Sequence, residues 1–177
     1  SATGKHVEII RIQELGGVSN AIQKGTDIAR NMAIEISGLQ REETDISEVV
    51  MSIKCGASDT TSGIASNCVI GYVADKLVDL GATVIFGETT EFIGGEHLLA
   101  RRAVGGENGP VGRKIYQIVN EMEGRAKAIG CDMRKGQPTP GNIAGGLSSI
   151  EEKSLGAIMK SGSRPIQGVL EYPQHAA

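Results

Sequence analysis

Two short runs rich in β-branched residues, each followed by a polar loop, constrain the fold of this chain most strongly. Val49–Ile53 leads into a loop that begins at Lys54, and Ala82–Phe86 leads into a polar segment that begins at Gly87. The second run is apolar throughout its middle, which is typical of a strand buried in a parallel sheet. Because helical patterns alternate with these strands, the sequence predicts an α/β fold. We expect a mainly parallel sheet with helices on both faces, in a Rossmann-like three-layer arrangement.

Helical periodicity accounts for most of the remaining chain. Apolar residues recur at spacings of three and four, and most of these stretches end at a glycine. The predicted helices cover 18–37, 66–80, 96–102, 111–129 and 149–160. Alternation and β-branched residues predict two further strands, His6–Ile12 and Ile166–Leu170.

Charged and glycine-rich stretches separate these elements. Leu39–Asp45 is a predicted charged linker, and Gly105–Pro110 consists of turn residues. Gly136–Asn142 contains two prolines and two glycines, so we expect an ordered loop without regular structure. The pattern predicts one α/β domain, or a fragment of one, over residues 4–172, with a candidate sub-boundary at 103–112.

Charge and composition argue against several classes of partner. The net charge is −3 and no basic stripe is present, so we expect neither nucleic acid nor an anionic membrane as a partner. The apolar runs are far shorter than the roughly 20 residues that cross a bilayer. The N-terminus lacks the apolar segment of a signal peptide. Three cysteines without a C-x-x-C pair suit a reducing compartment, and we expect a cytoplasmic protein.

The loop after Ile53 has the densest set of polar side chains. Ligands in parallel α/β folds bind beyond the carboxyl ends of strands, and N–H groups at a helix start favour a carboxylate or phosphate. The substrate-binding and catalytic candidates in this loop are Lys54, Cys55, Gly56, Ser58, Asp59, Ser62 and Asn67. The alternative is that its Ser, Thr and Asp side chains only cap the following helix. Cys55 has no histidine beside it in sequence, so we do not expect it to be a nucleophile.

Two later polar loops are predicted at the same edge of the sheet. Their candidates are Glu88, Glu91, Glu96 and His97 in segment 87–97, and Cys131, Asp132, Gln137 and Asn142 in segment 130–142. Carboxylates and an imidazole can act as general acids and bases, or can bind a divalent metal. The alternative for segment 87–97 is a solvated helix face. Cys131 is more typical of a small buried apolar residue than of a nucleophile.

Several nucleotide and hydrolase motifs are absent from the sequence. Gly106–Lys114 contains glycines and a lysine, but its spacing does not match a phosphate-binding P-loop and no Ser or Thr follows the lysine. There is no G-x-G-x-x-G after a strand and no G-x-S-x-G. We therefore expect no nucleotide cofactor.

Taken together, the polar segments resemble the altronate/galactarate dehydratase family over nearly all of the chain. The segments that carry the resemblance are Ile12–Gly17, Lys54–Asp59, Ser62–Gly63, Ser66–Asn67, Gly87–Glu91, Gly95–His97, Gly130–Asp132, Gln137–Asn142 and Lys160–Gly162. Cys68 departs from the proline expected there, and Gly105–Gly112 is richer in glycine than the usual turn. Thr60–Thr61 replaces a small residue and an aromatic one, which leaves the substrate open.

The resemblance implies a lyase that removes water from a sugar acid such as altronate or galactarate. The family includes the large subunit of sulfolactate sulfo-lyase, so removal of sulfite is an alternative. Activity in the family implies a divalent metal, Fe²⁺ or Mn²⁺, with ligands that the sequence does not identify. A homo-oligomer or a partner subunit is also implied. Family members are longer at both ends, so the resemblance implies that this chain is a fragment of a longer enzyme.

For this lyase chemistry we expect Glu88, Glu91 and His97 to act as bases or metal ligands. Asp59 and Asn142 would orient other groups, and the loop Gly56–Ser62 would bind the substrate carboxylate. One alternative is a non-catalytic scaffold or assembly domain. Another is an α/β domain that binds a ligand without chemistry.

Overall fold

The structure, a computed structural model, describes residues 4–87 and 89–171. The chain divides into two compact units, Ser1–Thr44 and Asp45–Ala177, and each is described by itself. The boundary falls in the predicted charged linker, which forms neither helix nor strand over 39–45. The predicted domain span of 4–172 stays a prediction, and residues 103–112 lie inside the second unit.

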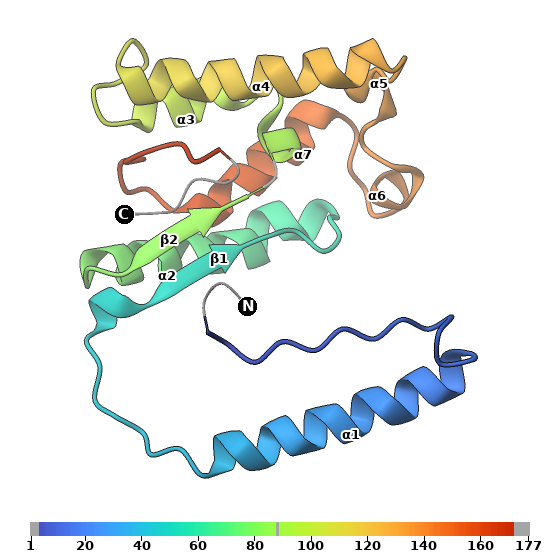
Figure 1. Cartoon of the computed structure of the whole chain (residues 1–177). Coiled ribbons are helices and arrows are strands. Elements are labelled where there is room, and N and C mark those ends of the chain that lie inside the picture. Colours follow the sequence, from blue (N-terminus) through green and yellow to red (C-terminus); the bar gives the residue numbers. More distant parts are fainter. Residues whose placement is uncertain (1–3, 88, 172–177) are drawn as a thin grey trace. The chain divides into compact units, whose positions relative to one another are not determined.

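The first unit consists of helix α1 (Val18–Ser37) and the segment before it. The helix confirms the predicted one, but the predicted strand His6–Ile12 is wrong. Among the described residues this segment has no partner strand. It instead runs along α1 (Figure 1), where the Ile10 side chain lies beside Gly25 and His6 contacts Glu35. An alternating pattern yields a strand only where a neighbouring backbone satisfies its N–H and C=O groups.

The second unit is mostly helical. In chain order its elements are η1 (Ile46–Glu48), β1 (Val50–Ile53), η2 (Ser62–Ser66), α2 (Asn67–Asp79), β2 (Thr83–Phe86), η3 (Thr89–Phe92), α3 (Glu96–Arg102), α4 (Pro110–Ala128), α5 (Met133–Gly136), α6 (Pro140–Ala144), α7 (Ile150–Ile158) and η4 (Met159–Ser161). The turn η2 is π-helical, and the other η elements are 3-10 helices. The predicted helices in this unit are confirmed, and so are the two central strands. Across the described ranges, none of the helices combines the length and apolarity needed to span a bilayer.

The sheet of the described residues is one parallel pair. Val50 of β1 lies opposite Thr83 of β2, Ile53 lies opposite Phe86, and α2 connects the two strands (Figure 1). This confirms the α/β class but not the three-layer Rossmann-like arrangement. The predicted strand Ile166–Leu170 is also wrong, because Ile166 forms a single parallel bridge with Ala103. Ala103 lies between α3 and the turn at Gly105, so its backbone is extended too briefly to continue the pairing.

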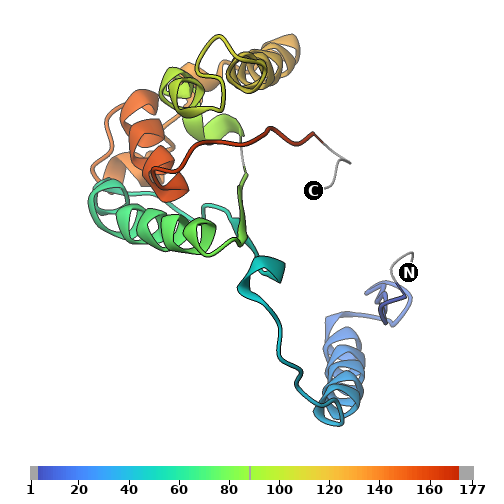
Figure 2. The same ribbon diagram turned by 90° about the vertical axis from the view of Figure 1, so that its left-hand side faces the viewer.

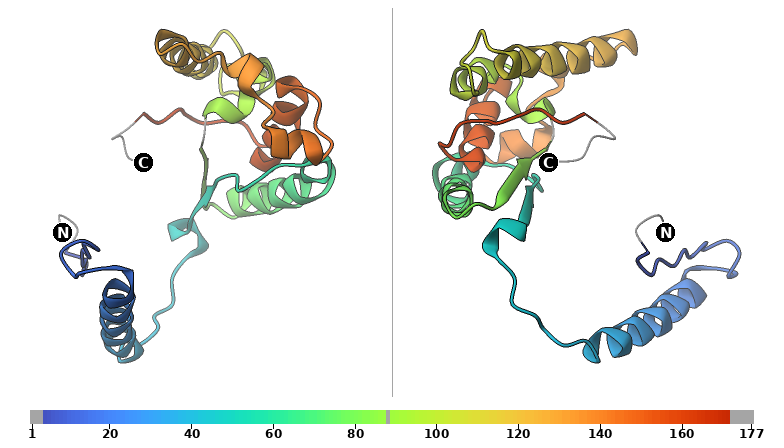
Figure 3. Two further views of the ribbon diagram at one scale, coloured as in Figure 1. Left: turned by 90° about the vertical axis from the view of Figure 1, so that its right-hand side faces the viewer. Right: turned by 60° about the vertical axis from the view of Figure 1, so that its left-hand side comes forward.

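The hydrophobic core of this unit lies among helices rather than on the sheet. Figures 2 and 3 show α7 between α2 and the pair α3–α4. The buried core residues are Phe92, Ile93, Leu99, Ala103, Ile115, Val119, Ile150 and Ile158. They come from η3, α3, α4, α7 and the residues next to them. Because two strands alone bury little apolar surface, the packing of these helices supplies most of the hydrophobic stabilisation.

The segment Gly136–Asn142 is more regular than its composition predicts. Helix α6 begins at Pro140, in the first helical turn, where its missing N–H is not needed. Thr139 and Asn142 form a reciprocal capping box at this start. The expectation of no regular structure is therefore wrong for Gly136, the last residue of α5, and for Pro140–Asn142.

Glycines let α7 and η4 approach η2 and α2 at backbone distance. A Cβ atom on Gly63 would lie 2.9 Å from the Cα atom of Gly156, closer than real Cβ contacts. A Cβ atom on Gly71 would overlap the carbonyl oxygen of Met159 and would crowd Gly162. At these positions a side chain has no space, so glycine is required for the helices to pack this closely.

We expect Gly71→Ala to lower the free energy of unfolding by about 1–3 kcal/mol, because the added methyl group forces α2 and η4 apart. Gly124→Ala in α4 is the matched control, because no atom of the described residues outside its own helix lies within 4 Å of its Cβ position. The control should raise stability by about 0.5–1 kcal/mol, as alanine favours the helix. Urea unfolding followed by circular dichroism measures both changes. Equal midpoints for Gly71→Ala and the unsubstituted protein would contradict the packing described above.

Candidate functional site

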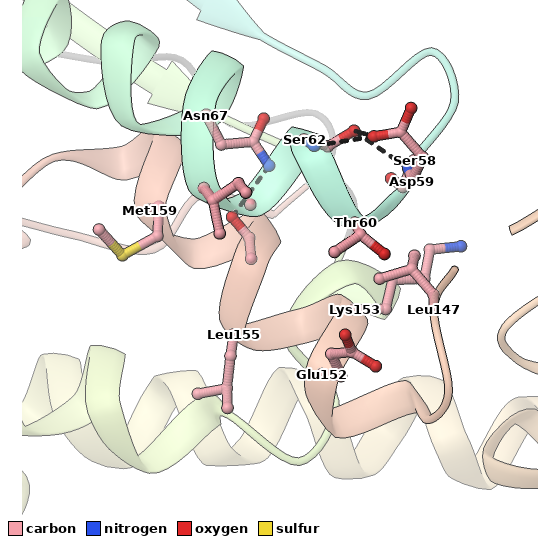
Figure 4. A pocket seen from close by; sticks show the side chains of 13 residues that line it. Ser58, Asp59, Thr60, Ser62, Asn67, Leu147, Glu152, Lys153, Leu155 and Met159 are labelled. Atoms are coloured by element: carbon pink, nitrogen blue, oxygen red, sulfur yellow. Dashed lines mark hydrogen bonds between the residues drawn. The ribbon is translucent and has the colours of Figure 1, made fainter. Parts of the chain in front are cut away.

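A cavity of about 260 Å³ lies between the start of the helix that follows β1 and one face of α7 (Figure 4). Four of the residues predicted from the first polar loop line it. They are Ser58, Asp59, Ser62 and Asn67. On the other side, α7 contributes Glu152, Lys153 and Gly156. The first loop thus forms one wall of a cavity whose opposite wall comes from far along the chain.

Asp59 closes the turn that begins the helix. Its carboxylate accepts hydrogen bonds from the Thr61 hydroxyl at 2.7 Å and from the Ser62 backbone N–H at 2.9 Å. The Ser62 hydroxyl accepts in return from the Asp59 N–H at 3.1 Å. Hydrogen bonding, led by that from Thr61, holds the pKa of Asp59 below its ordinary value. Asp59 therefore caps the helix, as the structural alternative predicted, while it also lines the cavity.

Asn142 joins the first loop to the third. It is buried, and its side-chain amide donates to the carbonyl oxygen of Ser58 at 2.8 Å. Its side-chain oxygen accepts from the Thr139 N–H at 3.1 Å and from the Thr139 hydroxyl at 2.8 Å. The backbone N–H of Thr60 also donates to the carbonyl of Gly145, which follows α6. Two loops that are about 80 residues apart in sequence are thus held together by polar contacts.

Sequence reasoning missed Lys153. Its ammonium group donates to the side-chain oxygen of Gln137 at 2.8 Å and to that of Asn142 at 2.9 Å. A lysine within a predicted amphipathic helix is normally expected on the solvated face, so nothing in the pattern distinguished it. The one available signal was that its helix directly follows the third polar loop.

The second polar loop lies on another side of α7. The Ser154 hydroxyl donates to the carbonyl of Ile93 at 2.8 Å, which fixes this segment to α7. Glu91 is buried and forms an ion pair with buried Lys160, and one of its carboxylate oxygens has no hydrogen-bond partner among the described residues. His97 lies in the first turn of α3 and is partly buried. Glu88 lies outside the described residues.

The predicted site residues therefore fall into separate groups. Within the described part of the chain, neither Glu91 nor His97 lines the cavity. Lys54, Cys55 and Gly56 lie between β1 and the cavity wall and do not line it either. Over 4–87 and 89–171, no three His, Cys, Asp or Glu side chains are grouped closely enough to hold a metal ion. The described residues do not fit a metal site, and Fe²⁺ or Mn²⁺ stays a prediction.

The second unit matches a known family. Residues 46–177 correspond to the family described as D-galactarate/altronate dehydratase, C-terminal. Over 171 residues the chain is 44% identical to the (2R)-sulfolactate sulfo-lyase subunit beta of Chromohalobacter salexigens, an alignment that covers 96% of this chain. It is 39% identical to the galactarate dehydratase (L-threo-forming) of Escherichia coli K12, over 89% of this chain. Against the altronate dehydratase of Bacillus subtilis 168 the identity is 33%, over 92% of this chain.

These relatives all carry names of lyases, which places the chain in a lyase family. The chain belongs to the D-galactarate/altronate dehydratase family, which confirms the resemblance drawn from its polar segments. It spans 43%, 29% and 32%, respectively, of the lengths of the three relatives. The matched region contains β1, the cavity and all the polar loops described above.

Because the Thr61 hydroxyl donates to Asp59, we expect Thr61→Val to raise the pKa of Asp59 toward 3.8. The lowered pKa means that the Asp59 carboxylate stabilises the fold above pH 3.8, and that this contribution is lost as the pH falls through the lowered value. NMR titration of the Asp59 carboxyl carbon measures the shift. Thr60→Val is the matched control, because the Thr60 hydroxyl donates to Gly145 instead. An Asp59 pKa that did not change in Thr61→Val would refute this assignment.

Proposed function

We propose that this chain supplies the substrate cavity of a lyase that eliminates water from a sugar acid such as altronate or galactarate. The cavity between the first loop and α7 carries the proposal. It brings together the hydroxyl group of Ser58, the amide of Asn67 and the ammonium group of Lys153. The names of the relatives from E. coli and B. subtilis support dehydration of galactarate or altronate. The whole reaction is proposed for the intact protein.

The reaction removes the proton on the carbon next to a carboxylate, while hydroxide leaves from the neighbouring carbon. That proton is weakly acidic, so the site must stabilise the extra negative charge that develops on the carboxylate. In this proposal Glu88 and His97 provide the base and the acid. The Glu91–Lys160 ion pair holds the second loop. A divalent metal, Fe²⁺ or Mn²⁺, would supply Lewis-acid stabilisation of the charged carboxylate, and it would need ligands outside the described residues. Asp59 and Asn142 keep the first loop in position.

A second candidate is elimination of sulfite from sulfolactate. The relative named as subunit beta of (2R)-sulfolactate sulfo-lyase is 44% identical, compared with 39% and 33% for the two dehydratases. The same proton would be removed, and sulfite rather than hydroxide would leave. Because that relative is one subunit of an enzyme, this candidate also implies a partner subunit. A homo-oligomer is the corresponding proposal for the dehydratase.

We expect the intact protein to convert at least one of galactarate, altronate and (2R)-sulfolactate, with faster turnover when Fe²⁺ or Mn²⁺ is added. Release of sulfite distinguishes the two candidates, and the formation of keto acid detects both. Glu88→Gln and His97→Ala should each lower kcat by about 100-fold or more, the usual size of an acid–base contribution. Exposed Glu121→Gln and His6→Ala are matched controls that should keep full activity.

Two results would overturn parts of this proposal. If neither Glu88→Gln nor His97→Ala changed kcat, the second loop would have no catalytic role. If all three compounds remained intact with either metal ion, the proposed substrate class would be wrong. A non-catalytic scaffold or assembly domain would then explain the polar loops better.

A further inference from the structure

One lysine in the cavity wall, Lys153, forms no ion pair with the described residues. Lys153 is half-buried, and its two hydrogen-bond partners among the described residues are the neutral amide oxygens of Gln137 and Asn142. Among the described residues, no carboxylate forms an ion pair with it. It is also the one Lys or Arg side chain among the described residues that line the cavity. An ammonium group carries three N–H donors, so one donor is left for a further acceptor.

The two carboxylates of the described cavity wall, Glu152 and Asp59, accept hydrogen bonds from other groups. Glu152 accepts hydrogen bonds from the backbone N–H of Ser148 at 2.7 Å and from its hydroxyl at 2.5 Å. Asp59 is occupied by Thr61 and Ser62 at the start of its own helix. Both carboxylates of the described cavity wall thus accept from neutral donors, and neither forms an ion pair with Lys153.

The Asn142 side chain does not require Lys153 as a hydrogen-bond donor. The Asn142 side-chain oxygen already accepts the N–H and the hydroxyl of Thr139, so it is satisfied without the lysine. Taking an ammonium group partly out of water without a counter-charge costs free energy. A bound anion would offset that cost through a charge-assisted hydrogen bond.

We propose that Lys153 binds the carboxylate of the substrate, and that Gln137 and Asn142 fix the direction of its ammonium group. This inference rests on the proposed function, because it takes the substrate to be a 2-hydroxy carboxylate. It moves the carboxylate from the loop Gly56–Ser62, where sequence reasoning put it, to the facing wall on α7. The loop then surrounds the bound anion and contributes hydroxyl and backbone groups around it.

Substitutions in the intact protein separate an anion-binding role from a structural one. Lys153→Met should raise KM by about 10- to 100-fold for whichever of galactarate, altronate and (2R)-sulfolactate is turned over. Lys153→Arg should recover most of the affinity, because arginine keeps the charge. Lys135→Met, on an exposed lysine of α5, is the matched control and should leave KM within twofold.

Gln137→Glu is the sharpest variant. It keeps an oxygen for the Lys153 ammonium group and adds a negative charge at nearly constant shape. If Lys153 only held α7 to the third loop, this change would strengthen the contact and leave KM unchanged. If Lys153 binds the carboxylate, KM should rise at least tenfold while the melting temperature does not fall, because the added charge competes with the substrate for the ammonium group. KM values within twofold of wild type in both Lys153→Met and Gln137→Glu would overturn the inference.

Lactate distinguishes failure of this inference from failure of the proposed function. It has the 2-hydroxy carboxylate but no leaving group on the next carbon. Saturation-transfer NMR should detect lactate on the wild-type protein and on Lys135→Met, with the signal lost in Lys153→Met and Gln137→Glu. If no elimination is found but lactate binds in this pattern, the proposed reaction is wrong and the anion site stands. If lactate does not bind, or binds equally to all four proteins, the Lys153 site is wrong.

Discussion

The close backbone contact between α7–η4 and η2–α2 is the constraint on which the rest of the second unit depends. Gly63 meets Gly156, and Gly71 meets the carbonyl of Met159, at distances that exclude any side chain. This approach lets the Asn67 amide donate to the carbonyl of Gly156 at 2.9 Å. A wider separation would remove that hydrogen bond, open the cavity wall and withdraw Lys153 from the first loop. Packing of glycines, rather than the two-stranded sheet, therefore defines the site.

Helix α7 connects the cavity with the core, because one of its faces lines the cavity and another packs in the core. Lys153 and Gly156 face the cavity, whereas Ser154 and Ile158 are buried toward η3 and α3. The chain then continues into Lys160, whose buried ion pair with Glu91 holds the second loop. Breaking such a pair leaves a buried charge without a partner and is strongly destabilising. The segment α7–η4 thus contacts both the cavity and the second polar loop, although the side chains of that loop do not line the cavity.

The prediction from sequence was strongest where the signal was local. Apolar residues at helical spacing, with glycines at the ends, predicted the main helices correctly, and runs of β-branched residues predicted β1 and β2. The strands His6–Ile12 and Ile166–Leu170 were wrong because pairing depends on a partner backbone that no local pattern specifies. The capped helix at Pro140 was missed because proline and glycine indicate turns as readily as helix starts.

The sequence alone determined the α/β class, the family and the polar first loop that lines the cavity, because capping residues and collinear polar segments can be read along the chain. Only the tertiary structure decided which groups face that loop. It placed Asn142 on Ser58, brought Lys153 into the cavity and committed Glu91 to Lys160. These contacts join residues up to 84 positions apart, and they depend on how closely helices pack. Helix packing is set by the shapes of facing side chains, which periodicity along one segment does not reveal.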